Sequence, residues 1–184
     1  MEAHVKKYFV YVGLAAAAAL VFGGGSTLLA GAGATAEDGQ KFEARLTGAE
    51  EVPAVVTDTT GKVEVIFSAD ETSASYELEV RKGVRVTQSH IHCGAAGVNG
   101  PVVVFLAGFH DRGWDVDGSW IENATVTNAN VIARPVSAAC PFAINTLADV
   151  ARAAREGLAY VNVHTIAHPG GEVRGQLEAD DDER

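Results

Sequence analysis

Basic residues are scarce in this chain, and their scarcity excludes one class of function. The 184 residues include 14 Lys and Arg against 24 Asp and Glu, which gives a formal net charge of -10. Proteins that bind nucleic acid derive much of their affinity from Lys and Arg side chains that neutralise phosphates. The sequence has no basic stripe, so we exclude nucleic acid as a partner. An acidic surface of this kind attracts cations instead.

The motifs of common catalytic sites are also missing. No arrangement of Ser, His and Asp, or of Cys and His, indicates a nucleophilic enzyme. Gly94, Gly97 and Gly100 are regularly spaced, but the Lys and the strand-to-helix context of a phosphate-binding loop are absent. The sequence therefore leaves open whether the protein is an enzyme.

Cysteine is rare, with only Cys93 and Cys140. In an exported protein, a pair of cysteines is most simply one disulfide. Such a bridge would close a long loop and contribute roughly 3–4 kcal/mol in the chain-entropy treatment. The alternative is two separate free thiols.

Long hydrophobic runs are confined to the N-terminus. Lys6 and Lys7 precede an uncharged stretch at 8–22, and small residues then lead to Ala34-Thr35-Ala36. This order is typical of a secretory signal and its cleavage site. The run is shorter than the ~20 apolar residues of a spanning helix, although an uncleaved membrane anchor stays an alternative. No Cys lies near the cleavage region, which argues against a bacterial lipoprotein.

We therefore expect two parts of the chain. Residues 1–36 are predicted to be a signal peptide, and 37–184 a single domain with a core at 41–178 and an acidic, solvated tail at 179–184. The protein would be secreted, either extracellular or periplasmic, with no membrane association after the signal is removed.

Alternation of apolar and polar residues dominates the rest of the sequence and predicts strands with one buried face. The exception is 146–156, where apolar residues recur every three or four positions between Asn145, a plausible N-cap, and Gly157, a plausible stop. That pattern predicts a short helix. The expected strands are 42–46, 63–67, 76–80, 84–92, 101–106, 120–126, 158–165 and 172–177. Together these elements predict an all-β, antiparallel, Greek-key-like β-sandwich or barrel with one short crossover helix.

Histidines carry the strongest chemical signal. His90 and His92 are two apart on an expected strand, so their side chains share a face, with Cα atoms ~6–7 Å apart. Two imidazoles at that spacing can bind one metal ion. His164 belongs to a later strand, and the three would form one site if the two strands end at the same rim. Imidazole-rich sites with few carboxylates favour copper or zinc. The alternative is that these are ordinary strand histidines without a function.

Three further residues are predicted to lie around this site. His168 follows closely after His164 and would be a fourth ligand or a neighbour of the ligands. Asn162 shares the face of His164. Arg174 lies on the same face as Glu172, and we favour a cross-strand ion pair for it over a role in steering an anion towards the metal. His110 is a weaker candidate ligand in a polar stretch.

Three segments resemble one known family. They are Leu46-Thr-Gly-Ala-Glu-Glu-Val-Pro53, His90-Ile-His-Cys-Gly-Ala-Ala-Gly-Val-Asn-Gly-Pro-Val102, and Gly157 to Leu177 with its Asn-Val-His and His-Pro-Gly-Gly-Glu-Val-Arg-Gly-Gln runs. In this order they are similar to the CHRD (chordin-type) domain over roughly 41–178. The resemblance implies an extracellular β-sandwich-like domain. The family occurs in animal chordins, which bind growth factors of the bone morphogenetic type, and as a stand-alone exported protein in microbes.

A second resemblance concerns the histidines alone. A strand His-x-His with a later strand His is similar to the copper site of Cu/Zn superoxide dismutases, whose ligands would correspond to His90, His92 and His164. The bridging His and the zinc-binding loop of those enzymes have no counterpart here. The resemblance thus implies a zinc-free copper site at most.

The expectation for function follows from these observations. We expect an exported CHRD-domain protein that binds a transition metal, copper before zinc, through its strand histidines. A metal-free extracellular binding or structural module, with a protein or matrix partner, is the alternative. A superoxide dismutase-like copper enzyme is a further alternative.

Overall fold

The computed structural model describes residues 39–180. The predicted signal peptide, 1–36, and the last residues of the predicted tail lie outside the described part of the chain. Within that part, no helix combines the length and the apolar character needed to cross a membrane.

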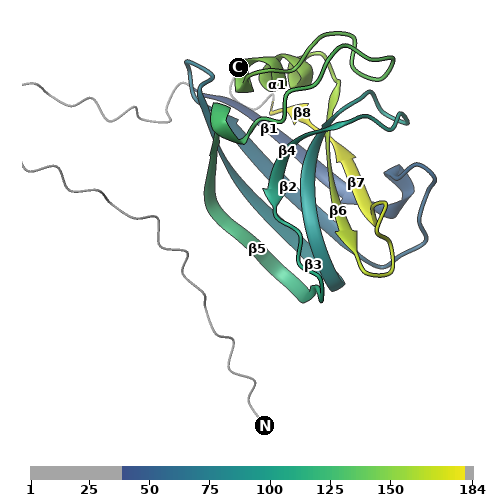
Figure 1. The fold of residues 1–184 in the computed structure, drawn as a ribbon. Coiled ribbons are helices and arrows are strands. Elements are labelled where there is room, and N and C mark those ends of the chain that lie inside the picture. Colours follow the sequence, from purple (N-terminus) through teal and green to yellow (C-terminus); the bar gives the residue numbers. More distant parts are fainter. Residues whose placement is uncertain (1–38, 181–184) are drawn as a thin grey trace, which may run out of the picture. The chain divides into compact units, whose positions relative to one another are not determined.

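The domain is built mainly from strands, and every ladder between them is antiparallel, as predicted. The single α-helix of the described residues is α1, Leu147–Arg155, and two short 3₁₀ turns occur at Gly48–Glu50 and Asn128–Asn130. The strands are β1 (Gln40–Thr47), β2 (Thr60–Phe67), β3 (Ser73–Cys93), β4 (Val102–Ala107), β5 (Trp114–Thr127), β6 (Ala159–Thr165), β7 (Val173–Gln176) and β8 (Glu178–Ala179) (Figure 1).

Five strands close into a barrel. They follow the order β2–β1–β7–β6–β3, and β3 also pairs with β2, which completes the ring. Strands β4 and β5 add to β3, and β8 adds to β1. The closed ring leaves few unpaired edges, which protects the sheet from pairing with other chains.

Strand β3 is one continuous strand of 21 residues, where the sequence predicted two strands with a break after Val80. Lys82 and Arg85 have positive φ angles of 52°, and the register with β5 shifts on both sides of Gly83. These irregularities act as bulges, which bend a strand without ending it. As a result, the first part of β3 pairs with β2 and the last part pairs with β6.

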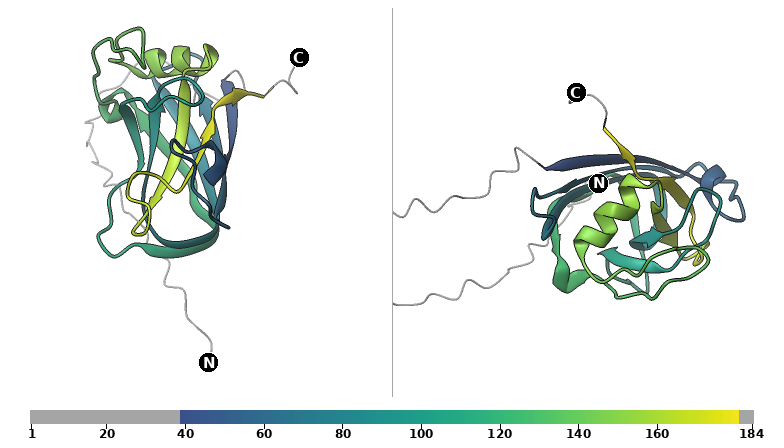
Figure 2. Two further views of the ribbon diagram at one scale, coloured as in Figure 1. Left: turned by 90° about the vertical axis from the view of Figure 1, so that its right-hand side faces the viewer. Right: turned by 90° about the horizontal axis from the view of Figure 1, so that it is seen from above.

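The hydrophobic core fills the barrel. It joins residues from β1 and β2, such as Phe42 and Val63, to Ile91 of β3 and Val161 of β6. Each fully buried side chain of this size contributes ~1.5–3 kcal/mol relative to an exposed one. Helix α1 packs its buried residues against one end of the barrel (Figure 2).

The predicted helix is present, with one correction at its start. Thr146 is the N-cap in place of the predicted Asn145: its hydroxyl accepts from the Asp149 N–H, and the Asp149 carboxylate accepts from the Thr146 N–H. A hydroxyl and a carboxylate three residues apart form such a reciprocal cap. Gly157 follows the helix with a φ of 68°, as expected of a C-terminal stop.

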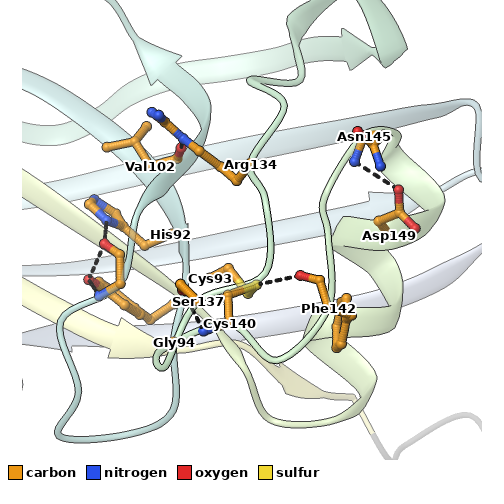
Figure 3. The surroundings of a disulfide bond; sticks show 12 residues. His92, Cys93, Gly94, Val102, Arg134, Ser137, Cys140, Phe142, Asn145 and Asp149 are labelled. Atoms are coloured by element: carbon orange, nitrogen blue, oxygen red, sulfur yellow. Dashed lines mark hydrogen bonds between the residues drawn. A yellow bond between two sulfur atoms is a disulfide. The ribbon is translucent and has the colours of Figure 1, made fainter.

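The predicted disulfide between Cys93 and Cys140 is also present, with its Cα atoms 5.5 Å apart. It fastens the end of β3 to the segment before α1. Figure 3 shows His92 and Cys93 on opposite sides of the strand. Cys93 belongs to the hydrophobic core, so the bridge holds the strand from its apolar side.

The last described residues are held to the barrel. Glu178–Ala179 pairs with β1, and the Asp180 carboxylate lies 3.0 Å from Lys41 Nζ. The Asp180 N–H also donates to the Lys41 carbonyl. The chain is therefore held to the barrel up to Asp180, because a lysine lies opposite the acidic residues.

Candidate metal centre

Strands β3 and β6 present two different faces. Ile91 and Val161 point into the core, whereas the alternate residues point to the other side. In the ladder, His92 lies opposite Tyr160, and His90 lies opposite Asn162. Directly paired residues of antiparallel strands project to the same face. The register therefore gathers the polar side chains of both strands on the face away from the core.

Three histidines meet on this polar face. One ligand atom from each of His90, His92 and His164 can be chosen so that all lie within 4.8 Å of one another. The three residues are 4%, 8% and 6% exposed. This is the group predicted from the His-x-His pattern, now with both strands adjacent as that prediction required.

The covering layer comes from loops and aromatic rings. The Tyr160 ring stacks on His92 at 4.7 Å between centroids, and the Phe105 ring packs edge-on against His90 at 4.4 Å. The loop at 94–101 is joined to the loop at 48–59 by a hydrogen bond from Asn99 Nδ2 to the Val52 carbonyl. The histidines are thus covered by Tyr160 of β6, by Phe105 of β4 and by the loop at 94–101.

Backbone carbonyls determine which nitrogens of two rings carry a proton. His92 Nδ1 lies 2.9 Å from the Gly100 carbonyl, and His164 Nδ1 lies 2.9 Å from the Pro169 carbonyl. A carbonyl only accepts, so each Nδ1–H donates. In the neutral rings Nε2 then has a free lone pair, and both Nε2 atoms face the centre of the cluster. His90 Nδ1 lies 3.0 Å from His164 Nε2.

Burial keeps the three rings neutral. It lowers the pKa of His90 to about 3, with smaller contributions from His164 and His92. It lowers the pKa of His92 to about 4, and it also lowers the pKa of His164. Imidazoles bind metal ions only when neutral, so the cluster is ready to do so at pH 7.

Asn162 and Glu51 complete the cluster. Asn162 Oδ1 lies 3.1 Å from His92 Nε2 and 3.0 Å from His164 Nε2. Glu51 is buried, and its Oε1 has no hydrogen-bond partner among the described residues. Burial raises the Glu51 pKa, while the charge of Arg174 and the Asn162 amide act in the opposite direction.

Arg174 lies beside the cluster, where it contacts an aromatic ring and a loop. Its guanidinium lies 3.4 Å above the Tyr160 ring and donates to the carbonyls of Ala95 and Val98. No ion pair of Arg174 is found among residues 39–180, so the favoured pairing is absent there, and the loop at 94–101 supplies its acceptors instead. With 1% exposure, Arg174 clamps the loop to the polar face.

The neighbouring carboxylate has its own partners. Glu172 accepts hydrogen bonds from the hydroxyls of Thr57, Thr59 and Thr165. These bonds lower the Glu172 pKa against the effect of burial. They also tie the loop at 48–59 to the start of β7.

The two remaining predicted histidines lie outside the cluster. His168 is not among the three residues whose ligand atoms converge. Its backbone N–H donates to Thr165 Oγ1. His110 stacks on Trp114 at 3.8 Å between centroids, and its Nδ1 is buried without a partner among the described residues.

Sequence reasoning missed Glu51, Tyr160 and the carbonyls of Gly100 and Pro169 as parts of the site. The carbonyls have no residue-type signal, because every residue has one. Glu51 lies within the first family-like segment, 46–53, but nothing local marks its carboxylate as buried.

Comparison with known proteins gives one match. The family model of the CHRD domain matches residues 42–177, which span nearly all of the described strands. No curated protein matches the chain, and no solved structure matches it. The match covers well over half of the chain and includes every residue of the histidine cluster, so this protein belongs to the CHRD domain family.

Proposed function

We propose that this protein is an exported CHRD-domain protein that binds a transition metal, copper in preference to zinc, through His90, His92 and His164. The observation that carries the proposal is the orientation of two imidazoles. His92 and His164 each donate Nδ1–H to a backbone carbonyl and turn Nε2 to the centre. Metal-ligating histidines characteristically donate their other N–H in this way, which orients the ring and the lone pair.

A purely structural cluster fits this arrangement poorly. Buried polar atoms are normally paired donor to acceptor. Here His90 Nδ1 can donate to His164 Nε2, but the His92 Nε2 lone pair lies 3.1 Å from Asn162 Oδ1, which is also an acceptor. Acceptors that face one another in a buried site repel unless a cation lies among them.

The types of donor favour copper or zinc. Three neutral imidazoles suit these borderline metals better than calcium or magnesium. Both cysteines are held in the disulfide, so no thiolate is available from the described residues. Between the two metals, nitrogen ligands generally bind copper(II) more tightly.

The proposed location outside the cytoplasm rests on two observations. The disulfide is of the kind that persists in oxidising compartments, and the sequence begins with a segment of signal-peptide type. The net charge of -10 would raise the local concentration of cations around such an exported protein.

Metal titration tests the proposal directly. The protein is purified without a polyhistidine tag, treated with chelator, and titrated with Cu(II) and Zn(II). We expect one tightly bound ion per chain, lost in His90→Ala/His92→Ala. The matched control is His110→Ala, another histidine with a buried nitrogen, which should bind metal as the wild type does.

Failure to bind either metal stoichiometrically would overturn the proposal and favour the metal-free extracellular module. Equal binding by the double variant would place the ion elsewhere. If copper binds as expected, a superoxide assay on the loaded protein tests the dismutase-like alternative. The acidic charge opposes an anionic substrate, so we expect metal binding without efficient dismutation.

A further inference from the structure

We propose that Asn162 supplies the fourth donor of the metal centre through Oδ1, so that neighbouring donors lie at about right angles around the ion, as copper(II) prefers. This inference rests on the proposed function, because it adds a ligand and a geometry to the same site. Asn162 then binds the metal directly, whereas the sequence predicted only that it shares a face with His164.

The distances between neighbouring donor atoms carry the inference. His90 Nδ1 to His164 Nε2 is 3.0 Å, His164 Nε2 to Asn162 Oδ1 is 3.0 Å, and Asn162 Oδ1 to His92 Nε2 is 3.1 Å. The four atoms thus form a chain with three nearly equal steps. None of the three steps is longer than an ordinary hydrogen bond.

These lengths distinguish two coordination geometries. Donors about 2.1 Å from one ion are about 3.0 Å apart when they subtend a right angle, and about 3.4 Å apart at the tetrahedral angle. The observed steps match the right angle. Tetragonal sites of nitrogen and oxygen donors are typical of Cu(II) or Ni(II), whereas zinc prefers a tetrahedron.

The surroundings of Nδ2 explain how the Asn162 amide is oriented. A Cβ added to Gly171, whose φ is 130°, would collide with Glu51 Oε1 and lie 2.9 Å from Asn162 Nδ2. Both atoms therefore border the same small space on the far side of the amide. A carboxylate there attracts Nδ2, which has hydrogens to donate, and turns Oδ1 towards the imidazoles. Glu51 thus acts as a positioning residue for Asn162.

Removing the oxygen while keeping the shape tests the role of Asn162. We would compare the full chain with Asn162→Leu, using Cu(II) titration against a competing chelator and electron paramagnetic resonance of the Cu(II) form. The matched control is Gln176→Leu, which removes another amide from the same sheet, one that donates to the carbonyls of Gly94 and Gly157. We expect Asn162→Leu to bind Cu(II) about 10- to 100-fold more weakly, with an altered spectrum, and the control to match the wild type.

A second variant keeps the test decisive if Asn162→Leu does not fold. Asn162→Asp places a charged oxygen at the same position, so we expect tighter Cu(II) binding and a larger rise in melting temperature on adding copper. Wild-type affinity and spectrum in Asn162→Leu, or weaker copper binding in Asn162→Asp, would overturn the role of Asn162. Absence of metal from the wild type would overturn the proposed function itself, and that result appears before any variant is compared.

Discussion

The two faces of strands β3 and β6 show how one pair of strands supports two kinds of buried surface. On the core face, Ile91 and Val161 are packed among apolar neighbours from all sides of the barrel. On the other face, His90, Asn162 and His164 are also buried but have polar neighbours at specific distances. Apolar contact stabilises through area removed from water and is not directional. Polar contacts depend on which donor faces which acceptor. The polar face therefore contributes mainly to the geometry of a binding site, and less to the stability of the fold.

The largest effect should come from the core face. Ile91→Ala removes a fully buried side chain and leaves a cavity, so we expect the free energy of unfolding to fall by about 2–5 kcal/mol. Chemical denaturation of the metal-free protein measures this. A much smaller loss would mean that the two faces do not differ in the way proposed.

On the polar face, His90→Leu should give the reverse pattern. His90 Nε2 is buried without a partner among the described residues, and an apolar side chain of similar size removes that cost. Because the substitution also removes the 3.0 Å contact between His90 Nδ1 and His164 Nε2, we expect the metal-free protein to be about as stable as the wild type. The stabilisation by copper, about 2.7 kcal/mol at a hundredfold excess over the dissociation constant, should disappear. Thermal unfolding with and without copper measures both, and retained copper stabilisation would contradict the assignment of His90.

Gly171 offers a test at the boundary of the polar face. Gly171→Ala puts a Cβ against Glu51 Oε1 at a φ of 130°, so we expect a loss of about 1–3 kcal/mol in stability and weaker Cu(II) binding. Gly170→Ala is the matched control, because its Cβ would meet nothing within 4 Å. If the two substitutions have equal effects, Gly171 and Glu51 do not contribute to the geometry of the site.

The polar face should also make stability depend on pH in the metal-free protein. Because the pKa values of His90 and His92, about 3 and about 4, lie below the ordinary value of 6.5, the unfolded chain binds more protons at mildly acidic pH. The contribution of these groups is present above pH 6.5 and is lost as the pH falls towards their folded pKa values. Between pH 7.5 and 5.5 we expect a loss on the order of 1 kcal/mol per histidine. Denaturation curves measure it, and His90→Leu should show a shallower dependence.

The core face was largely predictable from the sequence, because its signal is local. Alternation along 42–46, 63–67 and 76–80 marks the buried residues directly, and the structure buries Phe42, Val65 and Leu78 as that pattern indicates. The bend in β3 was not predictable in this way. It uses positive φ angles at Lys82 and Arg85, residue types that do not mark such a conformation.

The polar face was only partly predictable. The spacing of His90 and His92 fixes their common face, but the addition of His164 depends on β6 lying beside β3, which is a property of the whole fold. The contacts of Arg174 with the carbonyls of Ala95 and Val98 were not predictable either, because the loop at 94–101 is distant from it in the sequence. Glu51 could not be identified from the sequence either, because its burial depends on residues distant from it in the chain.

The cover over the histidines has a consequence for the rate at which an ion enters and leaves. The rings are 4–8% exposed, and His92 Nδ1 lies 2.9 Å from the Gly100 carbonyl of the loop at 94–101, so we expect an ion to enter when that loop moves aside. We therefore expect slow uptake and a long residence time, set by opening of the cover more than by the strength of the donor bonds. Such a protein would hold its metal through dilution and against brief exposure to competing chelators.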